Sequence, residues 1–203
     1  MSLSSDGHTV AIGGRFNDGN AGNAGHVRVY GWDVSDWSQM GSDIDGEATS
    51  DNSGWSVDLS SDGSRLAIGA YLNDGAGSEA GHVRVYEWNG TAWSQLGADI
   101  DGEGAGDRSG YSVAMSSDGS RVAIGAYLND GNGTSAGHVR VYEWNGSAWR
   151  KLGSDIDGGL ANDRAGVSTA LSSDGSVVAI GADQESQSKP GYVSVYALSL
   201  IHI

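Results

Sequence analysis

Hydrophobic and polar residues alternate along short segments of the chain. In residues 111–116, Val113 and Met115 occupy alternate positions. The pair Asp118-Gly119 ends this segment, and Asn145-Gly146 separates a later pair of segments. A period of two that is broken by Asp-Gly or Asn-Gly predicts successive antiparallel hairpins, because these residues tolerate the positive φ angles of tight turns. Helical periodicity is absent, so the pattern predicts an all-β protein.

The same pattern recurs four times. The tetrapeptide SSDG begins at Ser4, Ser60, Ser116 and Ser172, at a constant step of 56 residues. The hexapeptide GHVRVY begins at Gly25, Gly81 and Gly137, with a weaker copy, GYVSVY, at Gly191. In the third copy the four expected strands cover 111–116, 121–127, 138–144 and 149–156. Four strands in about 56 residues fit a propeller blade, since kelch blades have about 50 residues. A β-solenoid is the structural alternative, but its coils are shorter and lack such frequent reversing turns.

We therefore expect an all-β propeller built from four-stranded antiparallel blades, in a single domain or a propeller fragment over residues 1–203. The repeats cover approximately 1–52, 53–108, 109–164 and 165–203. The terminal blades are incomplete: repeat one lacks most of its first strand, and residues 198–203 do not match the other copies. The chain is thus expected to be a fragment. We expect the exposed strand edges to drive self-association, with a two-fold ring of eight blades as the candidate assembly.

Composition excludes several classes of protein. The formal charge is −15, with only 11 Lys and Arg, whereas nucleic-acid binding depends on basic surfaces. The chain has no Cys, which rules out disulfides, thiol nucleophiles and cysteine metal sites. No segment approaches the roughly 18 apolar residues of a membrane span, so membrane insertion is not expected. Seven Trp and eight Tyr indicate a globular protein with a buried core.

Three motifs of the third repeat suggest a family. They are Ser109–Ala114, Ala123–Ala126 and Gly137–Tyr142. In that order, they resemble the F-G-x-S-V-A, A-[IV]-G-A-P and G-x-V-Y-V-Y stretches of FG-GAP repeats in integrin-α-type β-propellers. This resemblance implies an adhesive propeller with an extracellular or cell-surface location. Two features depart from the family pattern. Ser109 and Tyr127 replace its Phe and Pro, and its calcium loop is shortened to Ser116–Gly119. One carboxylate in a tight turn cannot supply the six to eight oxygens that Ca²⁺ takes.

Acidic residues concentrate where one repeat joins the next. The candidate metal ligands are Asp43, Asp45, Glu47, Asp51, Asp99, Asp101, Glu103, Asp107, Asp155, Asp157 and Asp163. In a propeller this connection lies on the same face as the loop between the second and third strands. Ca²⁺ is the candidate cation, held by D-I-D-G-E and backbone carbonyls. The alternative is that Asp and Gly simply form turns and a soluble surface.

Other repeated side chains receive structural interpretations. One His stands at the start of each third strand, and a metal site shared between blades is not expected from His26, His82 and His138. Arg residues of the same strand are expected to bond carboxylates or backbone between blades, because an unpaired buried charge is costly. Trp pairs flank the Asn-Gly turns, as at Trp88 and Trp93. They could form a sugar platform, but packing across strands with Tyr86 and between blades is favoured.

No catalytic residue is predicted. Every candidate acid or base recurs from blade to blade, whereas an active site usually places its carboxylates in unlike environments. The chain has no G-x-S-x-G, H-E-x-x-H or phosphate-binding loop. The predicted function is a non-catalytic binding or adhesion module that presents acidic inter-blade loops to a protein, a carbohydrate or a cation. The alternatives are a carbohydrate-active propeller enzyme with channel-facing carboxylates, and a structural repeat segment of a larger surface protein.

Overall fold

The computed structural model describes residues 1–184 and 190–198, which form four antiparallel sheets. The first sheet contains β1 (Ser2–Leu3), β2 (Thr9–Gly13), β3 (His26–Trp32), β4 (Trp37–Gln39) and β5 (Ile44–Asp45). The second contains β6 (Ser56–Leu59), β7 (Arg65–Ala70), β8 (His82–Trp88), β9 (Trp93–Gln95) and β10 (Ile100–Asp101). The third contains β11 (Ser112–Met115), β12 (Arg121–Ala126), β13 (His138–Trp144), β14 (Trp149–Lys151) and β15 (Ile156–Asp157). The fourth contains β16 (Ala165–Leu171), β17 (Val177–Ala182) and β18 (Tyr192–Ala197). Among the described residues, no helix could cross a membrane.

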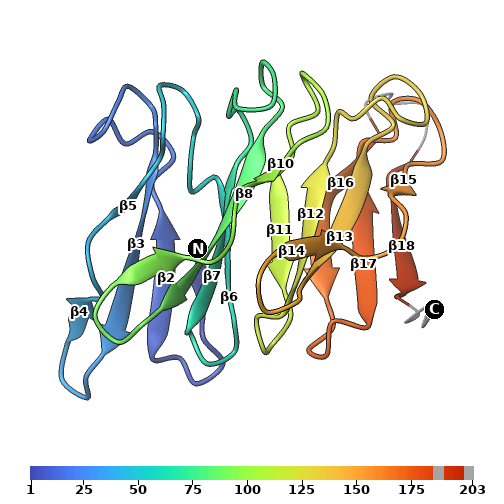
Figure 1. Ribbon diagram of the computed structural model, residues 1–203. Helices are drawn as coiled ribbons and strands as arrows, with labels where there is room; N and C mark the ends of the chain where they lie inside the picture. Colours follow the sequence, from blue (N-terminus) through green and yellow to red (C-terminus); the bar gives the residue numbers. More distant parts are fainter. Residues whose placement is uncertain (185–189, 199–203) are drawn as a thin grey trace.

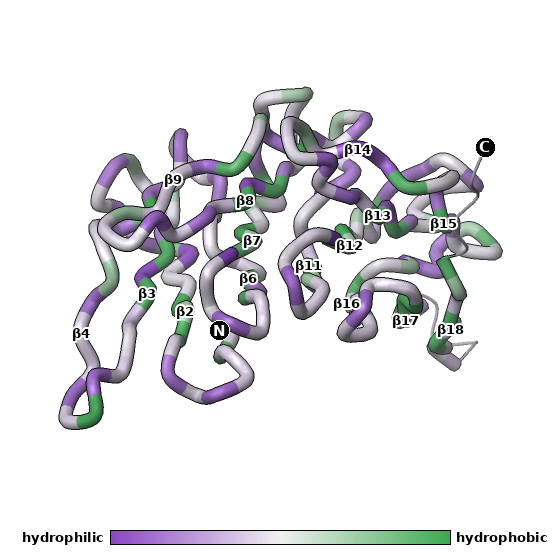
Figure 2. The backbone as a smooth tube through the Cα atoms, turned by 60° about the horizontal axis from the view of Figure 1, so that its bottom comes forward, coloured by the Kyte–Doolittle hydropathy of each residue, from purple (hydrophilic) through white to green (hydrophobic). Residues whose placement is uncertain are grey.

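The four sheets stand side by side in chain order, like the blades of a propeller that is not closed (Figure 1). In each sheet the strands follow one another in sequence from the inner to the outer edge. The all-β blade architecture predicted from the sequence is therefore confirmed. Hydrophobic residues concentrate on the strands, while the loops are mainly hydrophilic or of intermediate hydropathy (Figure 2).

The outer strand of the first three blades differs from the sequence prediction. The expected single strand over 149–156 is two short strands, β14 and β15, which both pair with β13. Between them Gly153 has φ +74°, a left-handed conformation that interrupts the extended strand. The Leu152 N–H still donates to the Val141 oxygen at 2.7 Å. The interrupted strand therefore remains attached to the sheet.

The Ser-Asp-Gly turns join neighbouring sheets to each other. In the second repeat the Asp62 carboxylate accepts hydrogen bonds from the hydroxyl of Ser60 and from the backbone of Ser64. Gly63 follows with φ +69°, as the Asp-Gly pair predicts. The Ser61 N–H then donates to the Ser117 oxygen of the next sheet at 2.9 Å. Equivalent bonds join the other turns, so the 56-residue period becomes a regular spacing between blades.

The hydrophobic core lies between the sheets. Ile68 of β7 is 1% exposed, whereas its counterpart Ile12 in the first sheet is 43% exposed. Val139 of β13 is fully buried, whereas its counterpart Val193 in the fourth sheet is 71% exposed. A Cβ on Gly69 would lie only 2.1 Å from the oxygen of Gly110, so glycine allows the close approach of adjacent sheets. Each inner sheet is shielded on both sides by its neighbours, and the two outermost faces are open.

Residues 185–189 and 199–203 lie outside the described residues. In the first sheet, β1 retains two residues of the inner strand. In the described part of the fourth sheet there are three strands, and the N–H of Leu198 donates to the oxygen of Ser176. The predicted mismatch of residues 198–203 with the other repeats falls mostly on undescribed residues.

Candidate binding face

Two sets of loops meet at one end of the blades, the upper end in Figure 1. One set joins the second and third strands of a blade, and the other connects successive blades. The Ser50 N–H donates to the Gly22 oxygen at 2.9 Å, and the Gly106 N–H donates to the Ser78 oxygen at 2.9 Å. We call this end, formed by residues 14–25, 46–55, 71–81, 102–111, 127–137 and 158–164, the loop face. The sequence analysis expected both sets of loops on one face.

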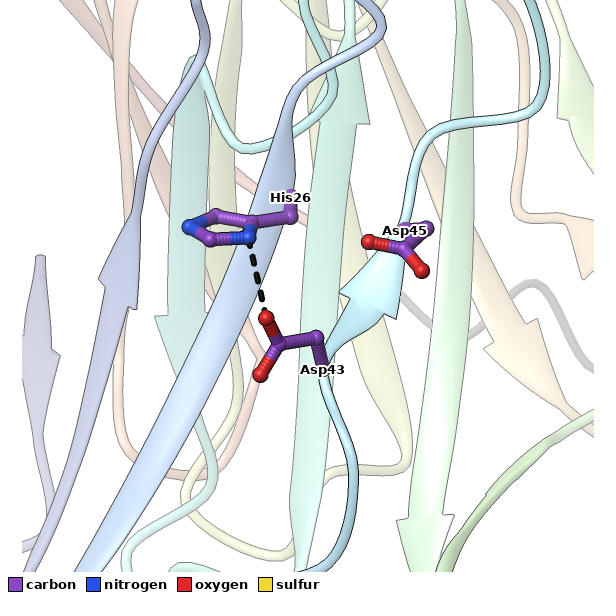
Figure 3. Close-up of side chains that lie close together, drawn as sticks. All are labelled: His26, Asp43 and Asp45. Atoms are coloured by element: carbon purple, nitrogen blue, oxygen red, sulfur yellow. Dashed lines mark ion pairs between the residues drawn. The ribbon is translucent and has the colours of Figure 1, made fainter. Parts of the chain in front are cut away.

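The acidic residues at the start of each connection lie next to a histidine. In the first sheet the Nδ1 atom of His26 is 3.3 Å from Oδ2 of Asp43 (Figure 3). Asp45, on β5, pairs in register with His26 on β3. Arg28 donates to both oxygens of Asp43 at 2.9–3.0 Å. These hydrogen bonds, with one from Gln39, lower the pKa of Asp43 to about 2.

Two further clusters cross the boundaries between sheets. Glu47 approaches His82 and Asp99 of the next sheet, and the equivalent cluster consists of Glu103, His138 and Asp155. In each cluster the three ligand atoms lie within 4.8 Å of one another. The side chains of the two histidines are only 2% and 3% exposed. Burial lowers the pKa of His82, and the charge of Arg84 lowers it further; burial also lowers the pKa of His138. Burial thus favours the neutral form of both imidazoles.

The sequence analysis separated these histidines from the acidic residues. Strand register supplies the connection, because His82 pairs with Asp101 and His138 pairs with Asp157. The Nδ1 atom of His138 lies 3.9 Å from Oδ1 of Asp157. The spacing of the histidine strand and the Asp-Ile-Asp run could have indicated this neighbourhood. It could not have shown that Glu47 crosses to the next blade.

Arginine side chains occupy part of each cluster. Arg84 donates to the backbone oxygen of Asp45 at 2.7 Å and lies 3.4 Å from Glu47. Arg140 contacts Glu103 and donates two hydrogen bonds to Asp155, at 3.0 and 3.1 Å. Arginine–carboxylate and arginine–backbone bonds between blades are therefore present, as the sequence analysis expected.

The last acidic residue of each connection accepts a hydrogen bond from a backbone N–H of the same connection. Asp51 accepts hydrogen bonds from the Ala48 N–H and the Asn73 amide, both at 3.0 Å. Asp107 accepts from the Gly104 N–H at 3.1 Å and the Asn129 amide at 2.8 Å. Asp163 takes the same position in the third connection, where the Leu160 N–H and the Tyr192 hydroxyl donate to it. All three are buried. Their oxygens fix the turn.

The residues present fit calcium poorly. The acidic residues of one connection have separate roles. In the first connection Asp43 binds Arg28, Glu47 approaches the next blade and Asp51 supports a turn. They do not converge as the six to eight oxygens that Ca²⁺ takes. The Ser-Asp-Gly turn is also unsuitable, because Asp118 Oδ1 accepts hydrogen bonds from the Ser116 hydroxyl and from the N–H and hydroxyl of Ser120. A nitrogen donor within each cluster instead suits a transition metal.

An aromatic strip borders the inner edge of the loop face. It is formed by Trp55, Tyr71, Tyr111 and Tyr127, whose neighbouring ring centroids lie 4.3–5.6 Å apart. Trp55 and Tyr111 precede the innermost strands β6 and β11. The guanidinium of Arg15 lies 4.2 Å from the centroid of Trp55. The sequence analysis missed this strip. The available signal was departure from the repeat, since Val167 takes the corresponding position in the fourth sheet.

The Trp pairs of the second and third sheets pack against the preceding sheet, whereas Trp32 and Trp37 of the first sheet are exposed. Trp88 and Trp93 contact each other at 5.5 Å, whereas the sequence analysis placed the ring contact with Tyr86. The indole N–H of Trp93 donates to the oxygen of Met40 in the preceding sheet at 3.1 Å. The pairs thus seal blade against blade, as the packing interpretation predicts.

A small cleft opens at each of two sheet boundaries. The first has a volume of about 350 Å³ and is lined by Asp43, Asp45, Tyr86 and Trp93, among others. The second has a volume of about 190 Å³ and is lined by the equivalent Asp99, Asp101, Tyr142 and Trp149. Each cleft combines carboxylate acceptors with aromatic rings, a mixture of polar and apolar groups found in small-molecule sites.

A family model matches less than half of the chain. The model of a family described as FG-GAP repeat matches residues 43–86 and 98–142. No curated protein sequence matches the chain significantly.

Solved structures share the fold at low sequence identity. A putative 6-phosphogluconolactonase from Bacteroides uniformis has a TM-score of 0.56 and 11% identity, over 98% of this chain and 54% of its own. Another, from Bacteroides fragilis, has a TM-score of 0.52 and 14% identity, over 76% of this chain and 37% of its own. A putative TolB from Agrobacterium tumefaciens has a TM-score of 0.50 and 14% identity, over 98% of this chain and 60% of its own. The chain thus spans about half the length of these structures.

Proposed function

We propose that this chain, which carries FG-GAP repeats, is a non-catalytic binding module whose loop face takes a carbohydrate or protein partner. The observation that carries the proposal is the aromatic strip. It crosses the boundary between the second and third sheets, and Trp55, Tyr71 and Tyr111 are half-buried. Fixed aromatic rings provide a large contact area with little loss of side-chain freedom on binding.

The sequence of the strip supports a binding role over a purely structural one. Residues that build the blades recur at the 56-residue step, as Ile68 and Ile124 do. The strip positions are aromatic only in the two middle repeats, where Trp55 corresponds to Tyr111 and Tyr71 to Tyr127. The first repeat has Arg15 and the fourth has Val167 at these positions. A single uneven surface suits one specific partner better than a symmetric one does. Separate acidic clefts at two sheet boundaries offer hydrogen-bond acceptors to hydroxyl or amide groups.

The electrostatics support binding without catalysis. A glycosidase needs one carboxylic acid whose pKa is raised so that it can donate a proton. Asp43 lines the first cleft, and hydrogen bonds from Arg28 and Gln39 lower its pKa to about 2. Carboxylates of this kind remain ionised and act as acceptors.

FG-GAP repeats are typical of extracellular proteins, so we place the module outside the cell or at its surface. The names of the structural neighbours do not extend to this chain, because identities of 11–14% support the fold alone.

The test compares two variants on arrays of glycans and matrix proteins. The double variant Trp55→Ala, Tyr111→Ala removes two of the three half-buried rings of the strip. Trp37→Ala is the control because Trp37 is exposed on the outer part of the first sheet. We expect the wild type and the control to retain one shared set of partners that the double variant loses. Equal binding signals on the arrays for the wild type, the control and the double variant would contradict the proposal. Turnover of an array sugar or of 6-phosphogluconolactone by the wild type would favour the enzyme alternative.

A further inference from the structure

We propose that Glu47, His82 and Asp99 form a binding site for one Zn²⁺ ion at the boundary between the first and second sheets. Glu47 comes from the connection that follows β5, His82 begins β8, and Asp99 lies between β9 and β10. The site differs from the calcium loop of the FG-GAP pattern in its position, its donors and its metal. It is also independent of the aromatic strip and of the proposed binding function.

The distances suit a shared ion better than direct contact. The three ligand atoms lie within 4.8 Å of one another. The Nδ1 atom of His82 is 3.8 Å from Oδ2 of Asp99, which is too long for a hydrogen bond. Zinc takes nitrogen and carboxylate oxygen at about 2.0–2.2 Å. In a tetrahedral site two such ligand atoms lie about 3.4 Å apart, so small rotations of the side chains bring the three atoms into range.

His82 is the observation that points to a ligand. Its side chain is 2% exposed, and no hydrogen bond to its ring is found in the part of the chain that the structure describes. Buried polar groups are nearly always bonded. An ion between His82 and the two carboxylates would satisfy this imidazole. Imidazole selects zinc and its transition-metal neighbours over Ca²⁺, which takes oxygen ligands.

The other two clusters explain why only this one should bind the ion tightly. In the third sheet Arg140 contacts both Glu103 and Asp155, and the ammonium of Lys151 lies 2.6 Å from Asp155. Two cations there balance two carboxylates. In the first sheet Arg28 is bidentate on Asp43. Basic side chains thus occupy both carboxylates of the third-sheet cluster, and in the first-sheet cluster they occupy both oxygens of Asp43.

The second cluster keeps a net negative charge. Arg84 is the only basic side chain that contacts it among the described residues, and its shortest hydrogen bond, at 2.7 Å, goes to the backbone of Asp45. Neutral Gln95 replaces Lys151, and its amide lies 2.6 Å from Asp99. One cation therefore faces two carboxylates. Three protein ligands and a water complete the usual four-coordinate geometry, and the ion would tie the first blade to the second.

The experiment is isothermal titration of the whole chain with ZnCl₂, and with CaCl₂ as the comparison. We expect one tight zinc site per chain. The titration with CaCl₂ should show no comparable heat of binding. Glu47→Gln should weaken zinc binding by at least about 10-fold, and the matched variant Glu103→Gln should leave it unchanged. Gln95→Lys, at an exposed position, should also weaken binding, because it copies the third cluster. X-ray absorption at the zinc edge should show one imidazole ligand.

Several outcomes would overturn the site. The proposal fails if zinc does not bind, if three equal sites are found, or if Glu103→Gln weakens binding as much as Glu47→Gln does. It also fails if the absorption spectrum lacks an imidazole ligand. Unfolding midpoints measured in EDTA establish that each variant is folded, so a loss of zinc affinity can be assigned to the site. Retained zinc binding together with a failed array screen would separate this proposal from the binding function.

Discussion

The indole N–H of Trp149 donates a hydrogen bond of 2.8 Å to the carbonyl oxygen of Leu96, which belongs to the preceding sheet. We predict that Trp149→Phe lowers the free energy of unfolding by about 1–3 kcal/mol, because it leaves this half-buried carbonyl unpaired. The control is Trp37→Phe, since Trp37 is 41% exposed. Urea denaturation compares the two, and equal losses would contradict a role in joining the blades.

Gly97 of the second sheet faces the Trp pair of the third sheet and tests how tightly the blades pack. A Cβ on Gly97 would lie 2.8 Å from Cζ3 of Trp144, whereas a Cβ on Gly153 would meet no atom within 4 Å. Their φ angles are similar, at +84° and +74°, so both Ala variants carry a similar backbone cost. We predict that Gly97→Ala is more destabilising than Gly153→Ala by about 1–3 kcal/mol, because of overpacking. Thermal unfolding of both variants measures the difference, and the prediction fails if the two midpoints coincide.

The buried histidines predict how stability changes with pH. Burial lowers the pKa of His82 and of His138 in the folded state, whereas the unfolded chain protonates near pH 6.5. The unfolded state therefore binds more protons below about pH 6.5, and stability is lost as the pH falls from about 7 towards 5. Carboxylates with a lowered pKa, such as Asp43 at about 2, lose their contribution at lower pH than the histidines do.

Urea midpoints in EDTA from about pH 7.5 to 5.5 measure this effect. We expect His82→Gln to reduce the pH dependence, and His8→Gln to leave it unchanged because His8 is exposed. An unaltered slope in His82→Gln would show that this histidine is not the sensitive group.

Asp107 separates the turn-forming role from the predicted calcium role. Asp107→Ala leaves the N–H of Gly104 and the buried amide of Asn129 without their acceptor. We predict a loss of about 1–3 kcal/mol, equal in EDTA and in millimolar Ca²⁺. Asp101→Ala should change stability by less than about 0.5 kcal/mol, because Asp101 is exposed. A loss that appears only with calcium would support the calcium prediction.

The two outermost sheet faces predict self-association of the 203-residue chain. Val193 and Val195 are 71% and 65% exposed, whereas their counterparts Val139 and Val141 are almost fully buried against the next sheet. Ile12 is exposed on the opposite outermost face. We propose that a second copy covers these faces in the way that neighbouring blades cover each other, because burying such side chains stabilises by about 1.5–3 kcal/mol each. Sedimentation should show an assembly that Val193→Glu, Val195→Glu dissociates. A monomeric wild type at high concentration would contradict this.

The amino-acid sequence by itself determines the blades. Alternation of residues such as Val113 and Met115 defines a strand, and Asp118-Gly119 reverses the chain, as the observed hairpin β11–β12 confirms. Strands and tight turns depend on a few consecutive residues, so the sequence alone is enough to predict them. The 56-residue period follows from the same local signals and predicts the number of sheets.

Tertiary structure alone decides the interruption of the outer strand and the composition of each cluster. Gly153 could continue a strand or break it, and packing against the rest of the blade selects the break. Glu47 reaches His82 from 35 positions away because the second sheet packs against the connection from the first. The strip of Trp55, Tyr71 and Tyr111 also arises only when the inner ends of different sheets come together. Contacts between blades depend on the angle and spacing of whole sheets, and no run of neighbouring residues records either.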